Sequence, residues 1–275
     1  MKKLWLGVGA LVFVLVVLFL VIKIFKAPAA SSAKVARGSS DGIFEGSLKE
    51  AAALEAMGDI LAARDMYKSI IMENVSNPDI GDFQNKLEDL NMRIVLSAIN
   101  IPGQTAVREI KEGDSLSMIA DEFHTTADLI KRENGMKSDI VKIRQRLRVW
   151  TGRFSVLVDK SRNTLTLLSD GEVIKTFRVS TGKDNITPVG TFRIVNKLKD
   201  PSWTHEGQLI PAGDKRNILG TRWMGFDIPG YGIHGTTLPE TIGTQATAGC
   251  VRMLNNEVEL LYDFLPAGTE VVVID

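Results

Sequence analysis

Cysteine and histidine are the scarcest chemically reactive residues of this 275-residue chain, which has one cysteine and three histidines. The single thiol, Cys250, cannot form a disulfide within the chain, so it is either buried and inert or free and reactive. The three histidines, His124, His205 and His234, are scattered and offer no pair of ligands at metal spacing. We therefore expect neither an internal disulfide nor a metal site.

An excess of charge of either sign is also missing, because Lys plus Arg and Asp plus Glu both number 33. Zero net charge gives no overall field that would attract nucleic acid, and we expect no nucleic-acid partner. Basic residues are enriched only locally, at Lys142, Arg144, Arg146, Arg148 and Arg153. The first four alternate with other residues, which is the period of a strand with a solvated basic face. A polyanion-binding surface is the alternative.

Charged residues are absent from residues 4–22, a run of nineteen residues rich in Leu and Val. As a helix this run would be about 28 Å long, close to the hydrocarbon thickness of a bilayer. We expect a transmembrane anchor over residues 1–26, a single-pass membrane protein, and the rest of the chain on the periplasmic or extracytoplasmic side. A cleaved signal is the alternative, with the small residues at 27–29 as the cleavage site.

The chain after this run divides into segments of different pattern. Residues 27–40 are rich in Ala and Ser and lack apolar periodicity, as in a flexible linker. Residues 41–101 carry apolar residues at helical spacing, and Asn77-Pro78 is typical of a cap that opens a further helix, to about Asn100. The stretch LEAMGDILAARDMY resembles one tetratricopeptide-type helix pair. Since one repeat cannot stack into a solenoid, we predict a helical spacer.

The motif VREIKEGDSLSMIADEFHTTADLIKRENGM, followed by IVKIRQRLRVW, resembles a LysM module over residues 104–150. The resemblance implies a small βααβ fold that binds N-acetylglucosamine-containing glycan, with four candidate glycan-binding residues, Gly113, Asp114, Ser115 and Asn134. Asp114 or Ser115 is expected to cap the first helix, and Thr125 or Thr126 the second. A purely structural spacer is the alternative.

The LysM resemblance has two departures from the family pattern. Arg144 stands where the family usually has glycine before its glutamine. Val107-Arg108 replaces the usual opening aromatic residue. Both departures leave the predicted fold in place and bear on the glycan function.

Residues 152–275 alternate polar and apolar residues in several short runs, and Asp170-Gly171 is typical of a hairpin turn. One clear helix is expected to open with Asn255 or Asn256 as its cap and to stop before Pro266. This pattern predicts a mostly β domain, a β-sandwich with one or two helices.

Cys250 lies sixteen residues after His234, with glycines beside both. A histidine within hydrogen-bond reach can take the thiol's proton and make the thiolate the majority form. The Gly235 carbonyl could orient the imidazole, and amide N–H groups at and next to Cys250 could form an oxyanion hole. A small buried cysteine near a core histidine is the alternative, and spacing alone does not decide between them.

The blocks YGIHGTT and TAGCVRM resemble the signature of the L,D-transpeptidase (YkuD-type) catalytic domain, and STGKDNITPVGTF, DPSW and IPAGDKRNILGTRWMGF follow the family order. The resemblance implies Cys250 as nucleophile, His234 as base and the Gly235 backbone as orienter. It also implies that Thr247, Gly249, Val251 and Arg252 bind the substrate or the oxyanion, the alternative for Arg252 being an ion pair inside the fold. Many members have Ser-His-Gly-Cys where this chain has Thr-Ala-Gly-Cys, so Ala248 removes one auxiliary donor.

By the same resemblance, the partners are peptidoglycan peptide stems and glycan strands, and no cofactor is needed. The implied reaction forms cross-links between stems through a cysteine thioester. An L,D-carboxypeptidase with the same nucleophile is one alternative, and a catalytically degenerate wall-binding scaffold is another.

Overall fold

The computed structural model describes residues 40–75, 77 and 80–275. The predicted membrane anchor (1–26) and all but the last residue of the predicted linker (27–40) lie outside these residues. Within the described residues, the structure contains no helix whose length and apolar character would allow it to cross a bilayer. The chain divides into two units, Met1–Asn91 and Met92–Asp275.

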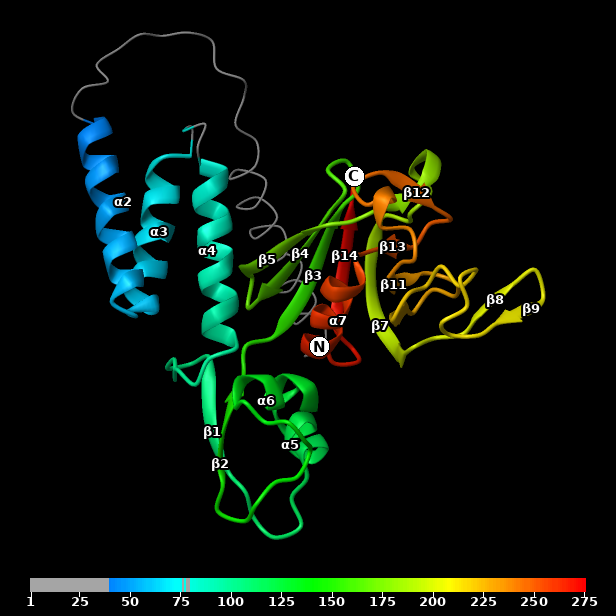
Figure 1. Cartoon of the computed structure of the whole chain (residues 1–275), viewed down its shortest axis with the longest axis horizontal. Helices are drawn as coiled ribbons and strands as arrows, with labels where there is room; N and C mark the ends of the chain where they lie inside the picture. Colours follow the sequence, from blue (N-terminus) through cyan, green and yellow to red (C-terminus); the bar gives the residue numbers. More distant parts are fainter. Residues whose placement is uncertain (1–39, 76, 78–79) are drawn as a thin grey trace, which may run out of the picture. The chain divides into compact units, whose positions relative to one another are not determined.

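The first unit is helical, with α2 (Ser40–Ala56), α3 (Ile60–Glu73) and most of α4 (Ile80–Val95) (Figure 1). The turn between α2 and α3 falls inside the stretch that resembles a tetratricopeptide helix pair. Gly58 makes this turn at a φ of +83°, and the Asp59 side chain caps α3 by accepting a hydrogen bond from the Ala62 amide. Helix α4 ends at Val95, earlier than the predicted end near Asn100. Of the predicted cap, Pro78 lies outside the described residues.

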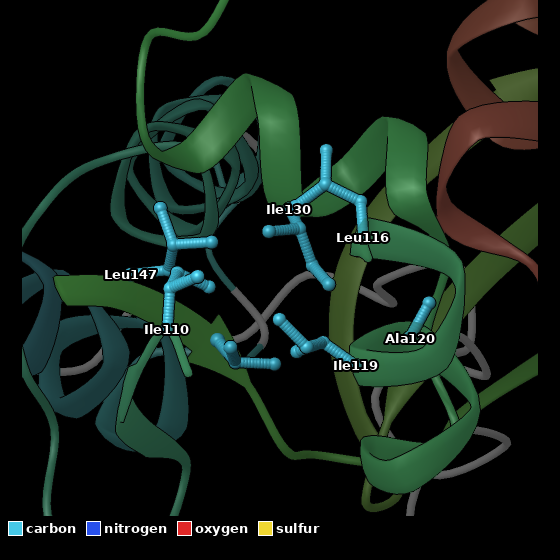
Figure 2. Packing of buried hydrophobic residues seen from close by; sticks show 7 residues of the cluster. Ile110, Leu116, Ile119, Ala120, Ile130 and Leu147 are labelled. Atoms are coloured by element: carbon cyan, nitrogen blue, oxygen red, sulfur yellow. The ribbon is translucent and has the colours of Figure 1, made fainter. Parts of the chain in front are cut away.

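The second unit contains a βααβ module, as the sequence predicted. Its elements are β1 (Thr105–Glu109), α5 (Leu116–Phe123), α6 (Ala127–Glu133) and β2 (Arg146–Trp150). The two strands pair antiparallel, with Thr105 opposite Trp150. Figure 2 shows the core between this ribbon and the two helices, which consists of Ile110, Leu116, Ile119, Ala120, Ile130, Leu147 and Val149.

Local signals set the ends of the helices in this module. Ser115 caps α5 by accepting from the Met118 amide, and Thr126 caps α6 by accepting from the Leu129 amide. Arg144, which occupies the family's usual glycine position, has a φ of +69°. The left-handed conformation explains why glycine is common there, since glycine adopts it without strain.

Of the four alternating basic residues that were predicted to be solvent-exposed, Lys142, Arg144 and Arg146 are exposed and Arg148 is not. Arg148 is buried, at 5% exposure, because its guanidinium pairs with Glu133 at 2.5 Å. The same guanidinium donates to the Val95 carbonyl at 2.8 Å and to the Ile99 carbonyl at 2.7 Å. The charge is therefore used at the C-terminal end of α4 and is not available to a polyanion.

The remainder of the second unit is mostly β, as predicted. Its strands are β3 (Phe154–Asp159), β4 (Thr164–Ser169), β5 (Glu172–Arg178), β6 (Thr181–Gly182), β7 (Gly190–Lys199), β8 (Trp203–His205), β9 (Gln208–Ile210), β10 (Arg222–Phe226), β11 (Gly232–His234), β12 (Gln245–Thr247), β13 (Val251–Arg252) and β14 (Glu270–Ile274). The β4–β5 hairpin turns at Asp170 and Gly171, whose φ angles of 48° and 82° belong to the predicted type of turn.

Eight of these strands form one continuous sheet in the order β13-β11-β10-β7-β14-β3-β4-β5. A β-sandwich, as predicted, would have two separate sheets. Here the strands form one sheet, because the ten-residue β7 pairs with β10 on one side and with β14 on the other. Helix α7 (Asn255–Phe264) packs on the sheet through Val258, Leu261 and Phe264, which are fully buried. The Phe264 ring meets that of Phe154 edge to face at 5.4 Å.

The βααβ module contacts the C-terminal part of α7 through charged groups. Two nitrogens of the Arg132 guanidinium, Nε and Nη2, contact the Asp263 carboxylate, at 2.7 and 2.6 Å. The Thr126 hydroxyl donates to the Asp263 carbonyl, and Lys199 pairs with Asp128 at 3.1 Å. These contacts attach the module to the same helix that borders the candidate site.

Candidate active site

Two short neighbouring strands position the cysteine and the histidine. Strands β11 and β13 run parallel, with Ile233 opposite Val251 and His234 opposite Arg252. Cys250 directly precedes β13 and is therefore level with Gly232, two residues before His234 on the adjacent strand. Because side chains alternate along a strand, this register puts Cys250 and His234 on the same face.

His234 is buried, at 2% exposure, and its Nδ1 lies 2.6 Å from the Gly235 carbonyl oxygen. A carbonyl oxygen only accepts, so Nδ1 carries the proton and Nε2 is left as the basic nitrogen. The pKa of His234 is lowered to about 4, mainly because burial disfavours the charged form; the hydrogen bond to Gly235 raises the pKa and the charge of Arg252 lowers it. The neutral imidazole is thus the form present at neutral pH. The Trp223 ring stacks beside it, 6.1 Å away between centroids.

The Cys250 thiol is less acidic than the sequence predicted. Burial raises its pKa, and this effect exceeds the opposing ones of the Gly232 amide and the Arg252 charge. The thiol donates to the Gly230 carbonyl, with a sulfur–oxygen distance of 3.4 Å. The prediction that the thiolate is the majority form is therefore wrong for the protein without substrate. Desolvation disfavours both the thiolate and the imidazolium, so the thiol and the imidazole are both neutral.

The turn before Cys250 is built by the predicted residues Thr247 and Gly249. The Thr247 hydroxyl donates to the Cys250 carbonyl at 2.6 Å and accepts from the Gly249 amide at 3.1 Å. Gly249 has a φ of +119°, and a Cβ there would lie 2.6 Å from the Tyr231 ring. Since the Gly249 amide is used in this turn, the Cys250 amide is the better candidate for an oxyanion donor. The Val251 side chain is buried in the sheet.

Arg252 is buried, at 4% exposure, and lies opposite His234 on the neighbouring strand. Its Nη1 donates to the Thr241 hydroxyl at 2.9 Å, and its Nε has no hydrogen-bond partner within the part of the chain that the structure describes. Among those residues no carboxylate forms an ion pair with it, unlike the buried Arg148. Its charge acts on the site at short range, since it lowers the pKa of both Cys250 and His234.

The four predicted glycan-binding residues have different surroundings. Gly113, Asp114 and Ser115 form the turn before α5, where Asp114 accepts from the Lys111 amide at 2.7 Å and Ser115 caps the helix. Asn134 uses both ends of its amide inside the module, because it donates to the Arg148 carbonyl and accepts from the Arg148 amide. Its geometry indicates a role in holding α6 to β2.

Three residues near the site were not among the predicted functional residues. Trp223 stacks on the imidazole, Tyr231 lies against Gly249, and Asn255 binds the loop after His234. The sequence analysis predicted Asn255 only as a possible helix cap. The cap position is Leu254 instead, and the Asn255 side chain binds the loop after His234. In the described residues, His, Cys, Asp and Glu form no group of three that could hold a metal.

Comparison with known proteins connects this geometry to two domain families. The sequence profile of the L,D-transpeptidase catalytic domain (YkuD) matches residues 153–273, and that of the LysM domain matches residues 109–150. Both predicted resemblances are therefore confirmed.

Individual relatives agree with the profile. YqjB of Bacillus subtilis (strain 168), named as an L,D-transpeptidase, is 40% identical over 126 residues, which are 44% of this chain and 70% of the relative. YkuD of the same organism, with the same family name, is 30% identical over 172 residues, 60% of this chain and 96% of the relative.

A solved L,D-transpeptidase from Mycobacterium smegmatis is 19% identical with a TM-score of 0.39, and the match covers 48% of this chain and 63% of that one. The two Bacillus relatives are covered over more than two thirds of their own length at 30% identity or more. On this ground the chain, which also carries a LysM domain, belongs to the L,D-transpeptidase family.

Proposed function

We propose that this protein cross-links the peptide stems of peptidoglycan through a thioester on Cys250. The observation that carries the proposal is the orientation of His234, whose Nδ1 is bound to the Gly235 carbonyl at 2.6 Å. This contact leaves Nε2 unprotonated, on the face of the sheet that the register also gives to Cys250.

In the first half-reaction, the thiol leaves its hydrogen bond to Gly230 and transfers its proton to His234 Nε2 as sulfur attacks. The attacked atom is the carbonyl carbon of the diamino acid at stem position three. The Cys250 amide stabilises the oxyanion, and the protonated imidazole then gives its proton to the amine of the departing terminal D-alanine. The carbon–nitrogen bond breaks, and a thioester to Cys250 remains.

In the second half-reaction, an amine of another stem attacks the thioester. His234 takes the amine's proton and returns it to the departing sulfur, so the new amide is the cross-link and the thiol is regenerated. Because thiol and imidazole start neutral, proton transfer accompanies each attack, and the base must be positioned before the substrate arrives.

The other segments place the thiol near its polymeric substrate. The LysM domain would bind glycan strands, and its contacts with Asp263 would hold the bound glycan at a fixed place relative to the catalytic domain. Residues 4–22 would anchor the chain in the bacterial membrane, with the catalytic domain outside the cytoplasm. Both attachments raise the effective concentration of stems at Cys250.

Carbapenem acylation tests the nucleophile, because a β-lactam carbonyl can replace the stem carbonyl. The folded protein at neutral pH is expected to gain the mass of one carbapenem, and Cys250→Ala is expected to gain none. His234→Ala should be acylated more slowly by roughly a hundredfold, because the thiol loses its base. A folded wild-type protein that stays unmodified would contradict the proposed chemistry.

Incubation with a tetrapeptide stem tests the reaction type. With an acceptor stem present, a cross-linked dimer and free D-alanine are expected. Tripeptide as the sole product, with or without acceptor, would instead identify an L,D-carboxypeptidase.

A further inference from the structure

One peptide group behind the imidazole is hydrogen-bonded at both of its polar ends. The Gly235 carbonyl holds His234 Nδ1 at 2.6 Å. The N–H of the same peptide group belongs to Thr236, and it donates to the Asn255 side-chain oxygen at 2.8 Å. The Asn255 nitrogen in turn donates to the Thr236 carbonyl, also at 2.8 Å.

The surroundings of Asn255 are built to receive its amide. The same side-chain oxygen also accepts from the Thr221 amide at 3.4 Å. Gly220 and Gly235 both lie against it, and a Cβ at either position would collide with the Asn255 oxygen. Thr236 is itself buried, at 4% exposure, so its backbone groups could not be satisfied by bulk water if Asn255 were removed.

We propose that Asn255 is a positioning residue that orients His234 through the peptide group between Gly235 and Thr236. Accepting the Thr236 N–H fixes the plane of this peptide, so the Gly235 oxygen points at the imidazole. It also polarises the amide, which makes that oxygen a stronger acceptor for Nδ1–H, since hydrogen bonds in a chain reinforce one another. The chain of contacts runs from His234 through one backbone amide to Asn255, the first residue of α7.

The consequence is a single imidazole tautomer. With Asn255 present, Nδ1 keeps the proton and Nε2 stays unprotonated, as the base of the proposed reaction. Without it, the peptide can rotate, the Nδ1–H bond weakens, and the proton can occupy Nε2, where it would block acceptance of the thiol's proton.

This inference rests on the proposed function, in which His234 is the base, and its test includes a measurement that needs no activity. Nitrogen-15 NMR of histidine-labelled protein, without ligand, reports which ring nitrogen is protonated. We expect wild type to show His234 as the Nδ1–H tautomer alone, and Asn255→Ala to show a mixture. Carbapenem acylation of Asn255→Ala should be slower by roughly ten- to a hundredfold.

Two further variants separate orientation from stability. Asn256→Ala is the matched control, because Asn256 is the exposed next residue of the same helix. It should keep the wild-type tautomer and rate. Asn255→Asp keeps an oxygen that can accept from Thr236 but loses the donor, so it should recover the Nδ1–H tautomer and part of the rate.

Asn255→Ala with a single Nδ1–H tautomer and the rate of Asn256→Ala would overturn the proposal, even if its melting temperature fell. Should Asn255→Ala fail to fold, Asn255→Asp decides, and a tautomer mixture in that folded variant would overturn the proposal equally. If wild type shows the single tautomer and Asn255→Ala the mixture, yet wild type is never acylated, the proposed function fails while the orientation of His234 by Asn255 stands.

Discussion

At the scale of single residues, burial favours the uncharged forms of the Cys250 thiol and the His234 imidazole. Burial raises the pKa of Cys250 and lowers that of His234, so neither ion is favoured before substrate binds. Arg252 favours the thiolate but disfavours the imidazolium, and it therefore does not support a preformed ion pair of the two. These pKa values suit a mechanism in which His234 takes the proton of the thiol while sulfur attacks the substrate. For such a base, the orientation of the imidazole matters more than a large difference in pKa between thiol and imidazole.

The lowered pKa of His234 predicts a pH dependence of stability. The native imidazole takes up a proton only near pH 4, whereas in the unfolded chain the ordinary pKa is about 6.5. Between these values the unfolded state binds more protons, so the free energy of unfolding decreases as pH falls from about 6.5 to 4, by up to about 3 kcal/mol. Urea unfolding of wild type and His234→Gln across this range measures the difference, and parallel curves for the two proteins would contradict the prediction.

At the scale of elements, the short turns hold the reactive groups more tightly than the strands do. Strand β13 has only two residues, and the conformation of Cys250 depends on the Thr247–Gly249 turn before it. Gly249 combines a positive φ with a close approach of Tyr231, so two separate constraints exclude a side chain there.

We predict that Gly249→Ala lowers the rate of carbapenem acylation at least about tenfold, because the new methyl group must displace Tyr231 or the Cys250 turn. The backbone strain should also cost about 1–3 kcal/mol of stability. Gly268→Ala is the control, since Gly268 has a φ of +88° but open space around its Cβ position. It should lose stability and keep its acylation rate; equal rates for both variants would argue against the steric role of Gly249.

The helix caps and the hairpin turn could be predicted, because they depend only on residues close in the sequence. Ser115 and Thr126 cap their helices, and Asp170-Gly171 turns its hairpin, because each acts on backbone within three residues. Arg148 and Asn255 were misjudged for the opposite reason. The partners of Arg148 include carbonyls about fifty residues earlier, and those of Asn255 lie nineteen and more residues away. Strand period and cap preference carry no information about such contacts.

The chemistry of the site was predictable only in part. The motif around Cys250 and His234 identified the family. The ionisation of the thiol depends on burial in the folded domain, which the spacing of the two residues does not predict. Val251 and Gly249 were predicted as site residues because they flank the cysteine. In the structure, Val251 pairs with Ile233 of β11, and the Gly249 amide donates to the Thr247 hydroxyl in the turn before Cys250.

At the scale of the whole chain, an ion pair between Arg132 of the LysM domain and Asp263 of α7 is one of the contacts between the LysM and catalytic domains. Arg132 is 43% and Asp263 13% exposed, so their ion pair is partly screened and contributes modestly, about 1 kcal/mol or less. Its importance lies in geometry, because it fixes the direction in which bound glycan would be presented.

Reversing one charge should weaken the docking of the LysM domain on α7 without unfolding either domain. Arg132→Glu is expected to lower cross-linking of intact peptidoglycan about tenfold, by loss of effective concentration, and to leave the reaction with a soluble tetrapeptide unchanged. Asp263→Arg should behave alike, and the double variant should recover activity on the polymer. A double variant no better than either single one would show that this pair does not set the docking.

The buried guanidinium of Arg148 also determines where the protein can be cut. A fragment starting at residue 104, where sequence places the first residue of the LysM module, would lack the Val95 and Ile99 oxygens and leave a cation facing vacant space beside Glu133. In that fragment, water or a rearranged side chain would have to accept the hydrogen bonds of the Arg148 guanidinium. A fragment that starts before α4 would keep the carbonyl acceptors of Arg148. A stable LysM fragment should therefore begin earlier than the LysM motif itself.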